Sequence, residues 1–232
     1  IETMRREGYE LLVSRPKVIE RVVDGVRQEP FENVVLDIGI EQQGRVIESL
    51  TERRGELLEI EVGQGDRVRL TFKVSSRGLM GFRSSFLSLT SGEGLMSFAG
   101  AGFGPRISGD LGSRQNGVLI SNTNGKAVGY ALFNLQARGR LFVEPGDLIY
   151  EGMVVGLHSR SNDLTVNPAK EKKLTNVRAS GSDEAIDLNA PVKMSLEQSL
   201  EFIDEDEFVE VTPSAVRIRK KLLKEYERKR VN

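Results

Sequence analysis

The sequence predicts an α+β protein built from two domains. In some stretches apolar residues alternate with a period of two, as in strands, and in others they recur every three or four residues, as in helices. A segment rich in glycine, proline and serine, residues 102–113, has neither period and separates two patterned regions. A chain of 232 residues is long enough for two domains of ordinary size.

Composition narrows the class of protein. Hydrophobic residues make up 38% of the chain and charged residues 29%, which supplies folded cores and excludes disorder. The absence of cysteine excludes disulfide scaffolds, thiolate metal sites and cysteine nucleophiles. His158 is the single histidine, so a two-histidine metal site cannot form. Since no apolar run approaches the ~20 residues of a membrane span, we expect a soluble, cytoplasmic protein.

Residues 1–28 are predicted to be the tail of a preceding domain. A helix ends near Gly8, and an extended segment interrupted by Pro16 follows and ends at the turn formed by Asp24 and Gly25. Because residue 1 is isoleucine rather than methionine, we expect the chain to be a piece of a longer protein.

Residues 29–104 are predicted to form strand, helix, strand, strand, helix and strand in that order. The expected elements are a strand at 34–40, a helix at 45–54, strands at 58–62 and 68–74, a helix at 79–89 and a strand near 95–99. The first helix places Val46, Ile47 and Leu50 on one side. This order is that of the ferredoxin-like split βαβ domain, in which both helices cover one face of an antiparallel sheet.

Residues 105–232 are predicted to form a mostly β, barrel-like domain with short helices. Strands are expected at 118–121, 127–135, 141–143 and 148–157. Ser195 and Gln198 have the spacing of a capping box that begins a short helix. Thr212 is expected to cap a last helix with Pro213 in its first position.

The net charge of −1 conceals a strong segregation of charge near the end of the chain. Residues 193–212 carry seven acidic side chains against Lys193 alone, whereas residues 216–232 carry eight basic side chains against two acidic ones. One interpretation is a solvated tail that neutralises its acidic neighbour. The other is a basic arm on RNA. The weaker candidates for RNA contact are therefore Arg217, Arg219, Lys220, Lys221 and Lys224.

A stronger candidate for RNA contact lies at 158–180, which lacks an apolar period over most of its length. Long loops of this kind in a compact domain are usually functional or disordered. Arginine and lysine contact phosphates, while serine, asparagine and threonine bond to sugars and base edges. The candidate residues are Arg160, Ser161, Asn162, Asn167, Lys170, Lys172, Lys173, Thr175, Asn176 and Arg178.

Several long motifs resemble a known family. Residues 44–55 (GRVIESLTERRG) and 88–94 (SLTSGEG) resemble the fifth domain of elongation factor G, and residues 4–19 (MRREGYELLVSRPKVI) resemble the end of its third domain. Residues 111–147, 161–180 (SNDLTVNPAKEKKLTNVRAS) and 207–221 (EFVEVTPSAVRIRKK) resemble the C-terminal domain of the BipA/TypA family of translational GTPases. The resemblance covers essentially the whole chain.

The resemblance implies a monomeric, ribosome-associated factor linked to stress or cold response and to large-subunit assembly. Its expected partners are large-subunit rRNA and the end of the A-site tRNA, and no membrane. GTP and Mg would belong to a GTPase domain absent from this chain, which has no GxxxxGK[ST] phosphate loop, since Gly125-Lys126 is followed by Ala127. We therefore expect no catalytic residue, cofactor or metal here.

Two other function classes remain open. Ferredoxin-like domains also serve as regulatory small-molecule-binding modules, which require an apolar or glycine-lined pocket at an interface. An enzyme acting through His158 and the nearby Asp163 is the second alternative.

Overall fold

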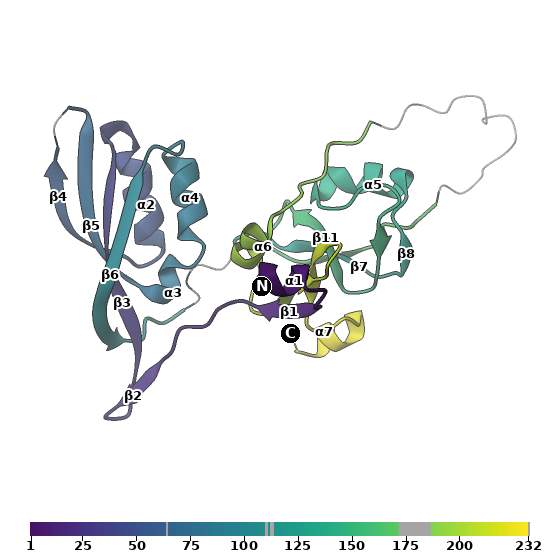
Figure 1. Ribbon diagram of the computed structural model, residues 1–232, viewed down its shortest axis with the longest axis horizontal. Coiled ribbons are helices and arrows are strands. Elements are labelled where there is room, and N and C mark those ends of the chain that lie inside the picture. The colour runs from purple at the N-terminus through teal and green to yellow at the C-terminus, as the bar shows by residue number, and fades with distance from the viewer. Residues whose placement is uncertain (64, 110, 112–113, 172–186, 232) are drawn as a thin grey trace, which may run out of the picture. The chain divides into compact units, whose positions relative to one another are not determined.

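The computed structural model (Figure 1) describes residues 1–63, 65–109, 111, 114–171 and 187–231. The chain forms two compact units. The contiguous unit is Pro16–Ser113, and the split unit combines Ile1–Arg15 with Arg114–Asn232. The chain therefore passes from one unit to the other twice. The domain limits expected after residues 28 and 104 stay predictions of family boundaries.

The contiguous unit is one antiparallel sheet with helices on one face (Figure 1). Its elements are β2 (Arg21–Val23), β3 (Val26–Gly39), η1 (Ile40–Gln42), α2 (Gln43–Glu52), β4 (Glu56–Val62), β5 (Arg67–Ser75), α3 (Ser76–Leu79), α4 (Phe82–Leu89) and β6 (Leu95–Pro105). The strand order is β2-β3-β5-β4, and β6 pairs with β3. The predicted ferredoxin-like arrangement is confirmed.

The core of this unit follows the period-two alternation of its strands. Val34, Leu36 and Ile38 of β3 are fully buried, and Val68, Leu70, Phe72 and Val74 of β5 lie in the same cluster. The helices contribute Val46, Leu50, Phe82 and Phe86 to it. Burying one face of the sheet against two amphipathic helices removes this apolar surface from water, which is the main stabilising term.

One predicted helix is divided in two. The pattern at 79–89 predicts a single helix, but α3 ends at Leu79 and α4 begins at Phe82. Gly81 between them has φ of 70°, a left-handed conformation that costs glycine little and interrupts a right-handed helix. Phe82 and Phe86 lie four residues apart on one face of α4, and both enter the core.

The split unit contains two open sheets. Its elements are α1 (Glu2–Arg6), β1 (Leu11–Ser14), β7 (Val118–Ser121), β8 (Gly125–Lys126), α5 (Gly129–Leu135), η2 (Gln136–Arg138), β9 (Gly139–Leu141), β10 (Leu148–Ile149), β11 (Met153–His158), β12 (Leu164–Val166), α6 (Leu196–Phe202), β13 (Glu207–Val211), β14 (Val216–Lys220) and α7 (Glu225–Val231). The larger sheet has the order β1-β13-β14-β11-β7-β12, with β9 also on β11, and β8 pairs with β10. The α+β class is confirmed, but the strands described do not close into a barrel.

Two elements of the split unit differ from the prediction. The expected strand at 127–135 is wrong: α5 occupies 129–135, because Ala131, Leu132 and Leu135 at helical spacing all face the core. The expected helix after Thr212 is also wrong. The Thr212 hydroxyl accepts a hydrogen bond from the Ala215 amide, closing a turn between β13 and β14, and a helix begins only at Glu225.

The capping box at Ser195 is confirmed. The Gln198 amide donates to the Ser195 hydroxyl at 3.2 Å, and the Ser195 amide donates to the Gln198 side chain at 2.9 Å. These two bonds satisfy orphan donors at the start of α6.

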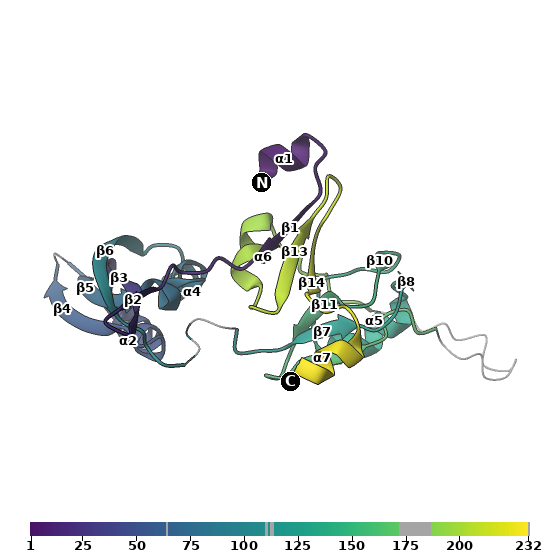
Figure 2. The same cartoon turned by 90° about the horizontal axis from the view of Figure 1, so that it is seen from below.

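The N-terminal segment belongs to the split unit by pairing. Strand β1 lies alongside β13 (Figure 2), with Leu11 opposite Val211 and Val13 opposite Val209. Leu11 and Val13 also pack against the apolar cluster of this unit. The first 15 residues are therefore structural members of a sheet whose other strands come more than 100 residues later.

The two separate cores predict separable unfolding. Replacing Phe72 by alanine should destabilise the contiguous unit by about 3–5 kcal/mol, because it empties the space of a fully buried ring. Replacing Ile203 by alanine should cost the split unit about 2–5 kcal/mol for the same reason. Differential scanning calorimetry measures which transition moves in each variant. If either variant shifts both transitions equally, the two cores unfold as one.

Candidate nucleic-acid interface

A buried glutamate organises the part of the split unit that carries the candidate residues. The Glu207 side chain has no exposed surface. Arg114 binds it through two parallel hydrogen bonds of 2.9 and 3.0 Å, and the amide of Asp204 donates to it at 3.0 Å. The Arg114 guanidinium also lies 4.5 Å from the centre of the Phe202 ring. A bidentate arginine compensates much of the cost of burying a carboxylate.

Lys220, one of the tail candidates, is the second partner of this glutamate. Its ammonium group lies 3.0 Å from Glu207, 2.7 Å from Asp163 and 2.7 Å from Asp206. Lys220 is 2% exposed and stands directly opposite Glu207 in the pairing of β14 with β13. It is therefore committed to this ion-pair cluster, and we leave it out of the RNA-contacting set.

Mutual stabilisation of these charges determines their pKa values. Burial alone raises the pKa of Glu207, but the hydrogen bonds from Arg114 and the charge of Lys220 outweigh burial and hold that pKa below its usual value. Burial alone lowers the pKa of Lys220, yet the charge of Glu207 and the hydrogen bonds to Asp163 and Asp206 raise it above the usual range. Both groups are thus charged at neutral pH.

The remaining tail candidates are also engaged by the protein. The β13–β14 hairpin sets acidic and basic residues opposite one another, so Arg217 faces Glu210 at 3.9 Å. Arg219 and Lys221 lie 5.9 and 5.2 Å from the centre of the Phe208 ring. Lys224 pairs with Glu151 at 2.7 Å. These contacts favour the interpretation in which the basic stretch neutralises its acidic neighbour.

The first candidates of the 158–180 segment lie in a tight turn between β11 and β12. The Gly117 amide donates to the Arg160 carbonyl at 2.8 Å, and the Val118 amide donates to the Asp163 carboxylate at 2.8 Å. The His158 ring contacts the Asn162 carbonyl through Nδ1. The backbone of this turn is therefore fixed, while the side chains of Arg160, Ser161 and Asn162 are exposed.

The next candidates follow β12. Asn167 accepts a hydrogen bond from the Ala169 amide at 3.0 Å, and the Val128 amide donates to the Pro168 carbonyl at 2.9 Å. Lys170 then points into solvent. The other candidates, Lys172, Lys173, Thr175, Asn176 and Arg178, lie outside the described residues.

His158 and Asp163 are both used structurally. His158 is 3% exposed, and its ring faces a backbone carbonyl. The Asp163 carboxylate binds the Val118 amide and the Lys220 ammonium. The contacts of these two side chains hold the β11–β12 turn against β7 and β14. We therefore do not propose the enzyme alternative.

A half-open cleft of about 570 Å³ lies beside the ion-pair cluster. Ile120, Leu222 and Val231 supply its apolar lining, but charged residues of both signs from β14, α7 and the segment before β13 supply the rest. The small-molecule alternative predicts an apolar or glycine-lined pocket. This cleft belongs to the split unit, whereas the small-molecule alternative places its pocket on the ferredoxin-like domain, so the cleft does not bear on that alternative.

Helix α5 brings together exposed residues that sequence reasoning missed because it assigned a strand there. Tyr130 is 36% exposed and Phe133 is 44% exposed. The signal available in the sequence was the spacing of Ala131, Leu132 and Leu135, which places the two aromatic residues on the opposite side.

Two protein-family models match this chain. Residues 26–108 match the family model described as elongation factor G C-terminus, and residues 116–225 match the TypA/BipA C-terminal domain. The two matches follow one another along the chain, so it carries an elongation factor G-like C-terminal domain followed by a TypA/BipA C-terminal domain. The chain belongs to the TypA/BipA family.

Individual relatives agree over the whole chain. It is 57% identical over 232 residues to the large ribosomal subunit assembly factor BipA of Salmonella typhimurium, and 56% identical to the proteins of that name in Haemophilus influenzae and Escherichia coli K12. In each case the match covers 100% of this chain and 38% of the relative. The chain thus spans well under half the length of these relatives.

In the described part of the chain, no helix is long and apolar enough to cross a membrane. Nor do three or more histidine, aspartate or glutamate side chains converge as metal ligands within the ranges that the structure describes.

The lowered pKa of Glu207 predicts a dependence of stability on pH. Its ionisation stabilises the fold above the pKa of an unfolded glutamate, about 4.3, and this contribution is lost as pH falls through the lower folded pKa. Glu207→Gln should cost about 3–5 kcal/mol at pH 7 because Arg114 and Lys220 lose their buried counter-charge. Urea unfolding between pH 7 and pH 3 measures both effects.

Glu197→Gln is the matched control, since it makes the same chemical change on the exposed side of α6 in the same unit. It should leave the free energy of unfolding within about 0.5 kcal/mol of wild type. Equal stability of the two variants at pH 7 would contradict the role given to Glu207.

Proposed function

We propose that this chain is the ribosome-binding part of a translational GTPase that acts in assembly of the large ribosomal subunit. Support comes from the relatives, whose printed name is large ribosomal subunit assembly factor BipA. The whole protein would bind GTP and Mg in a domain that this chain does not contain, and would act in the cytoplasm under stress or cold. In this proposal the chain itself binds RNA and catalyses nothing.

One observation carries the assignment of the contact. Arg160 and Lys170 are exposed and form no ion pair with any residue that the structure describes, whereas Arg217, Lys220 and Lys224 are paired with carboxylates. Cations without an internal counter-ion are available to phosphates, and each phosphate contact releases condensed counterions. We therefore place the main contact on the 158–180 segment and give the tail a lesser part.

The proposed partners are rRNA of the large subunit and the end of the A-site tRNA. Ser161, Asn162 and Asn167 carry exposed amide and hydroxyl groups that can bond to sugars and base edges of non-helical RNA. Such contacts can distinguish one RNA from another, whereas phosphate contacts alone carry no sequence information. The ferredoxin-like domain would contact the same subunit near the site where the GTPase domain is stimulated. Nucleotide state would then alter ribosome affinity through domain orientation.

Changing Lys170, Lys172 and Lys173 together to alanine should weaken binding to purified large subunits. If about three phosphate contacts are lost, the slope of log affinity against log salt should fall by about 2–3 units. Co-sedimentation at several salt concentrations measures both the affinity and the slope.

A control variant with Arg6, Lys17 and Lys193 changed to alanine removes three positive charges elsewhere, of which Lys193 is paired with Glu144. It should keep the wild-type slope to within about one unit, since those side chains are not assigned to the interface. If both variants lose affinity equally, net charge rather than the 158–180 segment determines binding, and the assignment of the contact is wrong.

A further inference from the structure

We propose that the exposed face of α5, formed by Tyr130, Phe133 and Asn134, is a stacking platform for unpaired RNA bases. This inference deepens the proposed function and rests on it, because it names a second contact and the kind of RNA that the contact selects. The geometry of the helix, the charge around it and its neighbours each support the proposal.

The two rings stand on one side of the helix. Ala131 and Leu132 are buried in the core, and Leu135 packs against it, so Tyr130 and Phe133 at positions i and i+3 face solvent together. Side chains three residues apart on a helix surface have Cβ atoms about 5–6 Å apart, so the two rings are neighbours. Exposed aromatic side chains of this kind can stack on bases of any sequence, because every base has a π-face.

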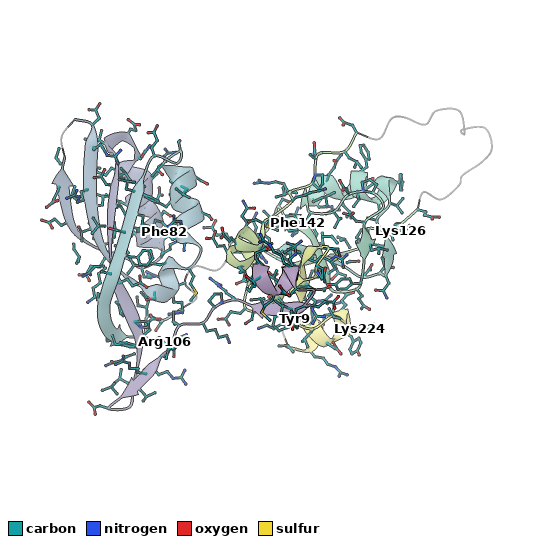
Figure 3. All side chains as sticks on the ribbon, in the orientation of Figure 1. Tyr9, Phe82, Arg106, Lys126, Phe142 and Lys224 are labelled. Carbon is teal, nitrogen blue, oxygen red and sulfur yellow. The ribbon has the colours of Figure 1, made fainter. Side chains whose placement is uncertain are left out.

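Charge complementarity selects RNA as the occupant. Residues 122–143 contain three basic side chains, those of Lys126, Arg138 and Arg140, and no acidic one. All three are exposed, and none forms an ion pair with another residue in the described ranges. Strand β8, which carries Lys126, lies beside α5 in both views, and Figure 3 marks Lys126 there. Phosphates on either side of a stacked base would meet these cations.

Both ends of α5 contact segments that carry predicted RNA-binding residues. At its start, the Val128 amide donates to the Pro168 carbonyl, two residues before Lys170. Just after its end, the Ser159 amide donates to the Arg138 carbonyl, next to Arg160. Lys170 and Arg160 thus belong to segments bonded near the two ends of α5, and in this proposal one strand of RNA contacts both of them and the aromatic face.

A fluorescence titration tests the stacking directly. The chain contains no tryptophan, so Tyr130→Trp introduces a single indole at the proposed platform. Titration with a 12-nucleotide oligoadenylate should quench its fluorescence, because a stacked base contacts the indole, while a 12-base-pair RNA duplex should not. Tyr9→Trp is the matched control on an exposed tyrosine of the same unit, 58% exposed, and should not be quenched.

Binding measurements separate stacking from charge. Tyr130→Ala with Phe133→Ala should weaken oligoadenylate binding about 5-fold or more for each ring removed, with an unchanged salt slope, because no phosphate contact is lost. Arg138→Gln should instead lower the slope by about 0.7. Tyr130→Leu with Phe133→Leu keeps the face apolar but removes the rings, and should bind as poorly as the double alanine variant.

The outcomes distinguish this inference from the proposed function. If wild type sediments with large subunits but the double alanine variant binds oligoadenylate as wild type does, the platform is absent and the proposed function stands. If the variant loses subunits but not oligoadenylate, a ribosomal protein occupies the face and the inference is overturned. If wild type binds neither subunits nor RNA, the proposed function fails and the platform fails with it.

Discussion

The Glu207 carboxylate has no exposed surface, and Arg114 and Lys220 compensate its buried charge. The charges around Glu207 come from three segments of the chain. Arg114 lies before β7, Lys220 ends β14, and Asp163, which also binds Lys220, lies in the turn before β12. These three segments must therefore meet at one point. Glu207 and Lys220 also stand directly opposite one another where β13 pairs with β14. Apolar residues of similar volume would stabilise the unit as well or better, but they would not specify which segments meet.

The contiguous unit also contains a buried glutamate paired with an arginine, close to its last residues. Glu29 is fully buried and binds Arg77 at 2.9 Å, and the Ile107 amide donates to the same carboxylate. Arg77 in turn donates to the carbonyls of Ile107 and Gly109. A buried glutamate and an arginine thus fix residues 107–109 in one unit, and a second such pair fixes Arg114 in the other. These two pairs flank the second of the two places where the chain passes between the units.

The contiguous unit could be predicted because its signals are local. Apolar residues alternate along β3 and β5, and Val46 and Leu50 form an apolar stripe on α2, so the sequence itself indicates which side of each element is buried. Few folds bury all of these sides in one core. The split unit depends on pairings that the sequence does not display. Thr212 followed by Pro213 suits a helix start and a turn equally well, and only pairing with β13 decides for the turn. Likewise, Lys220 is buried because it lies opposite Glu207 in the pairing of β14 with β13. The sequence does not show that pairing, so in the sequence Lys220 looks like a surface lysine.

The pairing of β1 with β13 has a consequence for biosynthesis. Leu11 and Val13 are synthesised before their partners Val211 and Val209, so β1 stays unpaired until β13 has been made. The contiguous unit, residues 16–113, includes no later part of the chain and can fold in the meantime. An unpaired apolar strand is prone to aggregation and to pairing with the wrong edge. The charged and polar residues around β1, together with Pro16 two residues after its end, limit that hazard until β13 has been synthesised. The first strand to be made is thus incorporated only when the second-to-last one emerges.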